Sequence, residues 1–252
     1  ETITETEEEN SEKNEKAGGM LTYGIPSYKL EKDVVEAEID IIRQLGVEIK
    51  CGVEVGKDIT LDELRKQGYE AFYIAIGCQG SRKAGIAGED ADGVMSAVDI
   101  LHKIAENHEL DLNGKKTVVI GGGNVAVDVA RSSKRCGADV LGMYCLENRE
   151  EMPASDEEIF ETEDEGIEIF NGWGPKEILT ENGKVKGIVL KKCVAVKDAD
   201  GKFNPQYDEN DTKTIECDNV YLSIGQSIVW GNLLEKESVE LGRANSPVAD
   251  SL

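Results

Sequence analysis

The residues best suited to bind a ligand form the turn Gly121-Gly122-Gly123-Asn124-Val125-Ala126, which follows the apolar run at 118–120. The pattern Gly-x-Gly-x-x-Ala is typical of a strand that enters a helix around a dinucleotide pyrophosphate. Gly121 permits the tight turn, Gly123 lets the backbone approach the phosphates, and Ala126 keeps helix and strand in contact, so that the first helical amides face the anion. We predict a dinucleotide site here; the alternative is a structural glycine turn that binds nothing.

An acidic residue follows the next predicted strand, at 139–144. Glu147 lies about twenty residues beyond the turn, where an acidic side chain meets the adenosine ribose in such sites. Its carboxylate would accept hydrogen bonds from a free 2′-hydroxyl and would repel a 2′-phosphate, so NADH is expected in preference to NADPH. Arg149 leaves an alternative open, because its guanidinium could swing to a phosphate, although a surface ion pair explains it equally well.

No other set of side chains indicates catalysis by the protein itself. His102 and His108 fall in or just after a predicted surface helix, and the six cysteines are scattered singly without a Cys-x-x-Cys pair. We expect no metal, no iron–sulfur cluster and no redox disulfide. We also expect no catalytic residue, because the chemistry would belong to the cofactors.

Strands and helices that would position the turn alternate along the chain. Before it we expect a helix at 34–45, a strand at 47–49, a short helix opened by the capping box of Thr60 and Glu63, an apolar strand at 71–76 and a helix at 97–106. After it we expect a helix ended by Gly137, the strand at 139–144, an acidic helix with a capping box of Ser155 and Glu158, a hairpin at Asn182-Gly183, a polar loop at 198–213 and a strand that runs from 219 into Gly225. This order predicts an α/β fold with a doubly wound parallel sheet across 117–225, to which the hairpin is an antiparallel addition.

Composition limits the partners. With 51 acidic and 28 basic side chains, the net charge of -23 argues against nucleic acid or an anionic membrane surface as a partner. No apolar run reaches the length of a spanning helix, so we expect no membrane insertion and a cytoplasmic location. Residues 1–17 are rich in glutamate and poor in large apolar side chains, and are predicted to be a disordered acidic arm.

Four segments occur in an order that resembles one family. They are Gly18-Gly19-Met20-Leu21 with Tyr23-Gly24-Ile25-Pro26, the glycine turn through Asp128, Arg149-Glu150-Glu151-Met152-Pro153-Ala154, and Ile224-Gly225-Gln226. Together they resemble the NAD(P)H-dependent glutamate synthase small (beta) subunit and its relatives, over nearly everything after Ala17.

The resemblance implies a Rossmann-like nicotinamide domain at 113–225, inserted between partial flavin-domain-like segments at 18–112 and 226–252. In that family hydride passes from NAD(P)H to FAD, and electrons pass onward to a partner subunit or an iron–sulfur protein. Gly24, Ile25 and Pro26 would lie against the isoalloxazine, and Gly225 and Gln226 would join the cofactor-binding residues.

Two departures from the family pattern shape the expectation. No strand with a glycine turn precedes Gly18, and the family's later Gly-Gly-Asp segment does not occur. We therefore expect a fragment of a longer flavoprotein, with FAD held by the full-length protein and no stoichiometric FAD on this chain alone. A second functional class stays open: a non-catalytic NAD(H)-binding or subunit-docking module.

Overall fold

The computed structural model describes residues 8–106, 110–242 and 245–249, so His108 and the first seven residues of the predicted arm lie outside the described residues. The chain divides into two compact units. One is built from the residues up to Gly80 and from Gln226 onward, and the other is Ser81–Gly225. The second unit carries the glycine turn.

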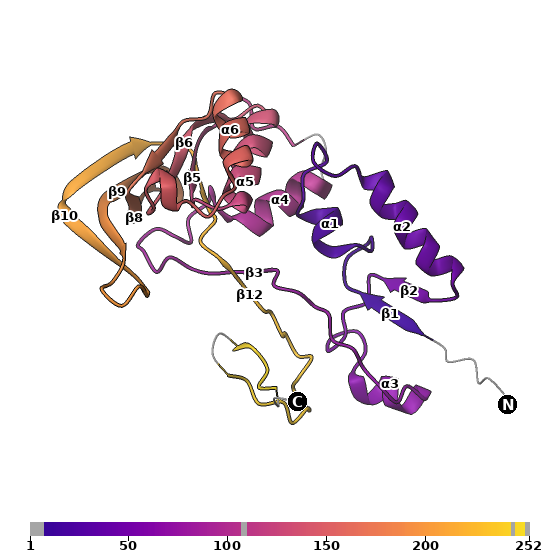
Figure 1. The fold of residues 1–252 in the computed structure, drawn as a ribbon. Helices are drawn as coiled ribbons and strands as arrows, with labels where there is room; N and C mark the ends of the chain where they lie inside the picture. The colour runs from indigo at the N-terminus through magenta and orange to yellow at the C-terminus, as the bar shows by residue number, and fades with distance from the viewer. Residues whose placement is uncertain (1–7, 107–109, 243–244, 250–252) are drawn as a thin grey trace. The chain divides into compact units, whose positions relative to one another are not determined.

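A five-stranded parallel sheet forms the centre of the second unit, in the order β4-β11-β5-β6-β7. Its strands are β4 (Val94–Ser96), β11 (Asn219–Leu222), β5 (Lys116–Ile120), β6 (Asp139–Cys145) and β7 (Ile169–Asn171). Strands β5 and β6 are labelled in Figure 1. Val119 of β5 lies beside Met143 of β6 in parallel register, which confirms the predicted pairing of these strands. Parallel sheets are buried on both faces, which accounts for the continuous apolar run in β5.

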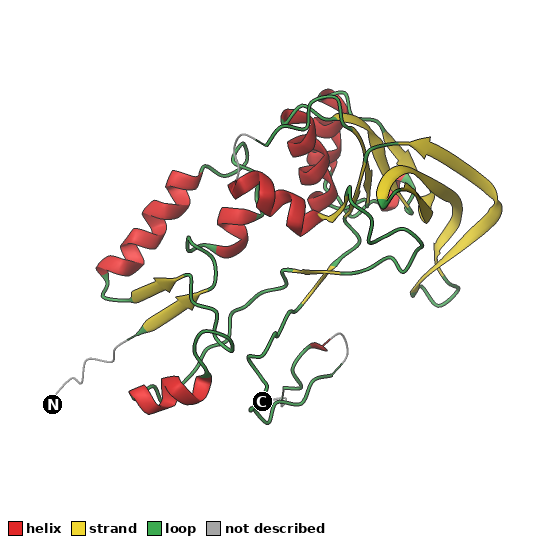
Figure 2. Cartoon of the chain, turned by 180° about the vertical axis from the view of Figure 1, so that it is seen from behind, coloured by secondary structure: helices red, strands yellow, loops and turns green. Residues whose placement is uncertain are grey.

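Alternate side chains of β5 enter two different cores. Val119 packs with the helices α4 (Ala97–Glu106), α5 (Asn124–Arg135) and α6 (Asp156–Asp164), which cover one face of the sheet (Figure 2). Val118 and Ile120 pack on the other face with residues of an antiparallel sheet. The predicted α/β class with a parallel sheet is confirmed, and a sheet instead of helices supplies the layer on the second face.

That second layer consists of β8 (Trp173–Glu181), β9 (Lys184–Lys197) and β10 (Phe203–Glu216). The β8–β9 hairpin turns at Asn182 and Gly183, both with positive φ (53° and 78°), as predicted from Asn-Gly. The polar loop expected at 198–213 is wrong over most of its length, because β10 pairs with β9 from Phe203 onward. Its side chains are mostly exposed, so their polarity reflects an edge strand in contact with solvent.

The first unit contains α1 (Gly19–Tyr23), α2 (Lys32–Gln44), α3 (Leu61–Gln67) and the parallel pair β1 (Glu9–Glu12) and β2 (Glu48–Cys51). The expectation of a disordered arm is therefore wrong for the residues of β1. Glu9 is held there by Lys50 at 2.7 Å and by the Tyr69 hydroxyl. Pairing with β2 supplies hydrogen-bond partners for the backbone of β1, which the composition of the arm does not predict.

Two further comparisons concern the first unit. The capping box at α3 is confirmed, since Thr60 and Glu63 bond each other's backbone amides, and Gly68 ends the helix with a positive φ. The strand expected at 71–76 is absent, and Tyr73 is 95% exposed. An extended apolar segment becomes a strand only beside another strand, and none of the described strands lies next to it.

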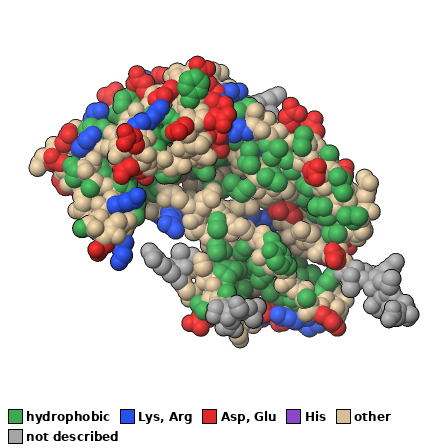
Figure 3. Space-filling view, in the orientation of Figure 1, with side chains coloured by type: hydrophobic (Ala, Val, Ile, Leu, Met, Phe, Trp, Pro, Cys, Tyr) green, Lys and Arg blue, Asp and Glu red, His purple; other side chains and the backbone are tan. Residues whose placement is uncertain are grey.

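The chemical character of the exposed side chains differs between α2 and α6. Apolar side chains are exposed along α2, among them Val34, Ile41 and Ile42, and acidic side chains gather around α6 (Figure 3). In the part of the chain that the structure describes, no helix combines the length and the apolar character needed to cross a bilayer.

Candidate nucleotide-binding site

The glycine turn leaves the carboxyl end of β5 and enters α5 under tight constraint. Gly121 has φ 142°, and a Cβ on it would lie 2.4 Å from the Ser223 carbonyl oxygen. A Cβ on Gly122 would lie 2.9 Å from the Cβ of Cys145 and 3.0 Å from Oε2 of Glu147. The packing of the protein itself therefore requires glycine at both positions.

Gly123 differs from its two neighbours. It is the N-cap of α5 with φ -100°, which any residue adopts, and a Cβ on it would meet only Pro153, at 4.0 Å. Neither the backbone nor the packing of the described residues requires glycine there. A position that is open on the protein side fits a turn over which a phosphate lies close to the backbone.

The first turn of α5 also suits an anion. No side chain caps it and it carries no acidic residue, whereas the first turns of α2, α3, α4 and α6 all contain Asp or Glu. The amides at a helix start and the helix dipole favour negative charge. Ala126 is fully buried against the sheet and Val125 packs at the edge of the same core, so the helix start is fixed in position.

A second segment lies against the turn. Ala154 donates its amide to the Gly122 carbonyl at 3.0 Å, and Ser155 donates its amide to Oδ1 of Asn124 at 2.9 Å. Pro153 is exposed beside Gly123. The sequence marked Met152-Pro153-Ala154 only as part of a family motif, and no spacing rule indicated that it contacts the turn.

Glu147 lies on the other side of the turn, after β6. Its carbonyl accepts hydrogen bonds from Nδ2 of Asn171 at 3.0 Å and from the Gly172 amide at 3.2 Å. Its half-buried carboxylate is directed toward Gly122. These bonds position an acidic group next to the turn, and Asn171, which the sequence analysis missed, carries no signal in the sequence that would have identified it.

Arg149 makes a two-pronged ion pair with Glu163, at 2.9 and 2.8 Å. Asn148 caps the short helix η1 (Arg149–Glu151) by accepting the amides of Glu150 and Glu151, which orients this segment. In the structure Arg149 is thus engaged with α6, and its guanidinium is not directed to the glycine turn.

Other predicted site residues lie on two different units. Gly225 belongs to the second unit, has φ 114°, and accepts the Arg82 amide at 3.2 Å. Gln226 belongs to the first unit, as do Gly24, Ile25 and Pro26. The loop at 24–26 is organised locally: Ile25 donates to the Met20 carbonyl at 2.8 Å, and Lys32 bonds the carbonyls of Leu21 and Ile25.

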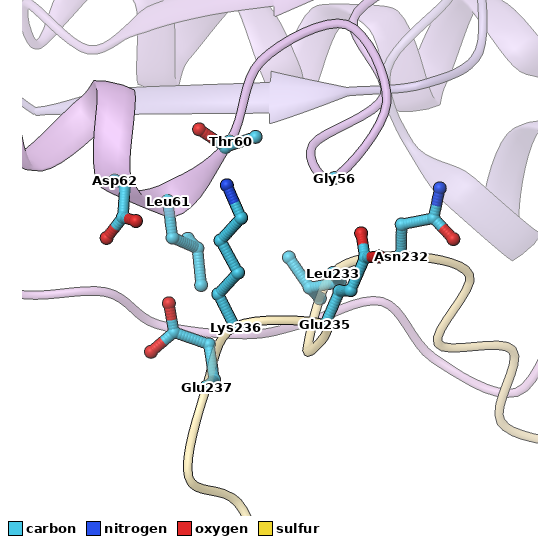
Figure 4. Close-up of a pocket in the computed structure, with 9 residues that line it drawn as sticks. All are labelled: Gly56, Thr60, Leu61, Asp62, Asn232, Leu233, Glu235, Lys236 and Glu237. Carbon is cyan, nitrogen blue, oxygen red and sulfur yellow. The ribbon is translucent and has the colours of Figure 1, made fainter.

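Two other kinds of site can be compared with the glycine turn: metal-ligand clusters and a hollow in the first unit. Among the described residues no group of three or more His, Cys, Asp or Glu side chains could hold a metal ion. A hollow of about 30 Å³ in the first unit is lined by residues of α3 and of 232–237, including Asp62, Glu235, Lys236 and Glu237 (Figure 4). It has room for a water molecule and none for a nucleotide.

Comparison with known proteins shows a family and several relatives that this chain matches. The family model described as "Pyridine nucleotide-disulphide oxidoreductase" matches residues 4–252. The chain is 38% identical over 217 residues to the NADP(+)-dependent formate dehydrogenase subunit beta of Moorella thermoacetica, covering 84% of this chain and 30% of that protein. It is 34% identical over 250 residues to the glutamate synthase (NADPH) small chain of Escherichia coli K12, covering 91% of this chain and 52% of that protein. The chain thus spans about half or less of the length of these two relatives.

Solved structures share the fold at low sequence identity. FprA of Mycobacterium tuberculosis in complex with NADPH has a TM-score of 0.74 at 20% identity, covering 95% of this chain and 68% of that one. Thioredoxin reductase of T. acidophilum has a TM-score of 0.62 at 20% identity, covering 96% of this chain and 76% of that one.

Proposed function

Because the chain belongs to the pyridine nucleotide-disulphide oxidoreductase family, we propose that its glycine turn binds NAD(P)H for an oxidoreductase similar to the glutamate synthase small subunits. Relatives named as oxidoreductases that use NADPH or NADP(+) support this activity class. The observation that carries the proposal concerns Gly123, the N-cap of α5. No side chain caps this helix, and the packing of the described residues does not require glycine at this position.

Each group at the site would have a separate task. The amides at the start of α5 would bind the pyrophosphate, and Glu147 would bind the adenosine ribose. The segment at 152–155, bonded to the turn by the Ala154 and Ser155 amides, would limit the access of water to the phosphates. When bound, nicotinamide and FAD supply the hydride chemistry, so no side chain of this chain has to act as acid or base.

FAD and an electron-accepting partner complete the proposal. The loop at Gly24, Ile25 and Pro26 would contact the flavin, by resemblance to the glutamate synthase small subunit family. Several relatives are named as subunits, among them the NADPH-Fe(3+) oxidoreductase subunit beta of Geobacter sulfurreducens, and by analogy this chain would pass electrons to a partner subunit or an iron–sulfur protein.

For the nucleotide itself we propose NADH. The names of the relatives specify NADPH or NADP(+) for those proteins. In this chain the carboxylate of Glu147 is directed toward the turn and Arg149 is paired with Glu163. A carboxylate at the ribose favours a free hydroxyl over a phosphate.

Calorimetric titration with NADH and NADPH tests both nucleotide binding at the turn and the preference for NADH. We expect one NADH site per chain and at least about tenfold weaker binding of NADPH, because a charge-assisted hydrogen bond is worth roughly 1.5–3 kcal/mol. Glu147→Arg should erase or reverse the preference, whereas Glu177→Arg, the same charge change on an exposed position of β8, should leave it unchanged. Equal affinities in the wild type would contradict the assignment of Glu147, and absence of binding of both nucleotides would contradict the proposed function.

A further inference from the structure

We propose that Arg82 is a second phosphate-binding residue, which contacts the phosphate on the nicotinamide side of the dinucleotide. The proposal rests on the function proposed above and adds a residue that the glycine pattern does not contain. It follows from three observations: the order of the strands, the contacts of Gly225, and the pairing of the arginines.

The strand order fixes the direction in which a dinucleotide would lie. β5 is central, with β6 on one side and β11 on the other. The chain reaches β5 from β4, which lies on one side of it, and continues to β6 on the other side, so the strand order reverses at β5. Ligands of open parallel sheets bind at such a switch point, outside the carboxyl ends of the strands. Glu147 follows β6, so the adenosine half would lie on that side and the nicotinamide half would extend past the end of β11.

Arg82 lies at this end of β11. Ser223, the first residue after β11, donates its amide to the Ile120 carbonyl at 2.7 Å and lies directly against Gly121. Two residues later, a Cβ on Gly225 would lie 3.2 Å from Cδ of Arg82 and 3.6 Å from its Nε. Ser223 and Gly225 thus connect the glycine turn to the stem of the Arg82 side chain, all within the second unit.

The charge environment of Arg82 is unusual for this chain, whose net charge is -23. The other arginines of the described residues all have a carboxylate within ion-pair distance: Arg43, Arg65, Arg131, Arg135 and Arg149. Among the residues that the structure describes, Arg82 alone of the arginines lacks one, while the adjacent Lys83 pairs with Asp90 at 2.7 Å. An unpaired guanidinium at the edge where phosphates bind is available for an anionic ligand, and its planar donors suit a phosphate.

Titrations of the wild-type chain and of Arg82→Gln with NADH, ADP and AMP test the proposal. AMP carries only the phosphate on the adenosine side, whereas ADP and NADH carry both. We expect Arg82→Gln to weaken NADH and ADP by at least about tenfold, as for the loss of a charge-assisted hydrogen bond, and to change AMP less than about twofold. Arg82→Lys, which keeps the charge without the planar donors, should give an intermediate loss.

Lys83→Gln is the matched control, because it removes the same charge from the next exposed residue. It should leave all three affinities within about twofold of wild type, since an exposed ion pair contributes little. Arg82→Gln that binds NADH and ADP like the wild type, or that loses AMP to the same extent, would overturn the role of Arg82. A wild-type chain that binds none of the three nucleotides would overturn the proposed function itself.

Discussion

Substituting alanine at two glycines of the same turn should have opposite consequences. Gly121→Ala forces a side chain into a backbone conformation with φ 142° and places its Cβ 2.4 Å from the Ser223 oxygen. Backbone strain of roughly 1–3 kcal/mol and overpacking of a similar size should together destabilise the fold by roughly 2–6 kcal/mol.

Gly123→Ala should leave the fold almost unchanged. Its φ of -100° is accessible to alanine, and the new Cβ would meet only Pro153 at 4.0 Å. Alanine is a poorer N-cap than glycine, which lowers stability, but alanine also restricts the unfolded chain, which raises stability. The net change in the free energy of unfolding should stay within about 1 kcal/mol. NADH binding should fall, because a methyl group directed into the open side displaces the phosphate from at least one amide, at a cost of roughly 1.5–3 kcal/mol or about 10- to 150-fold in affinity.

Urea denaturation and calorimetric titration of the two variants separate these effects. The expected result is a stable Gly123→Ala that binds NADH weakly, and a destabilised Gly121→Ala. Gly123 is not the position where phosphate approaches the backbone if Gly123→Ala binds NADH within about twofold of wild type, or if this variant loses as much stability as Gly121→Ala.

Four further predictions concern Glu147, Arg131, Glu165 and the cysteines. Glu147→Gln should bring the affinities for NADH and NADPH to within about threefold of each other, measured by titration, because the charge is removed and the shape is kept. Arg131 is buried and pairs with Glu161 of α6 and with Glu165, the C-cap of that helix. Arg131→Met should destabilise the fold by roughly 2–4 kcal/mol, measured by urea denaturation. Burial raises the pKa of Glu165, but hydrogen bonds from arginines of α5 outweigh it and lower the pKa, so its contribution to stability is present above the ordinary pKa of glutamate and is lost as the pH falls through the folded value. The loss on acidification should therefore be smaller in Arg131→Met. Burial raises the pKa of the Cys145 thiol to about 12, so iodoacetamide at pH 8 should modify the exposed Cys78 and spare Cys145, as read by mass spectrometry of the folded chain.

The sequence was sufficient where local pattern and burial agree. The hairpin at Asn182 and Gly183 and the helix α4 were predicted correctly, because each is set by a short-range signal. The parallel pairing of β5 with β6 was predicted correctly from the glycine motif, which joins the two strands through one helix. In these places the apolar period, the turn residues and the flanking glycines indicate the same structure.

Prediction was wrong where the partner strand decides the outcome. The apolar residues at 71–76 have the composition of a strand and no strand beside them among those described, while the polar residues of β10 have the composition of a loop and pair with β9. Part of the acidic arm became β1 in the same way, through β2. Strand propensity reflects how well a side chain fits a half-buried sheet surface, and it does not specify which strand pairs with the segment.

The same limit applies to the candidate site. Spacing predicts the glycine turn and Glu147 as candidate site residues, because one helix and one strand separate them along the chain. It did not point to Asn171, which bonds the Glu147 carbonyl from the next strand, or to Arg82, whose amide bonds the Gly225 carbonyl from a distant part of the sequence. These contacts depend on strand order, and no local pattern encodes that order.

Binding of the nicotinamide nucleotide by the turn between β5 and α5 can be observed at individual residues by NADH titration of the isotope-labelled chain, followed by backbone amide NMR. We expect saturable shifts centred on the amides at 121–126 and on that of Glu147, with one common dissociation constant. Saturable shifts confined to other residues, or no saturable shifts at NADH concentrations in the millimolar range, would contradict it.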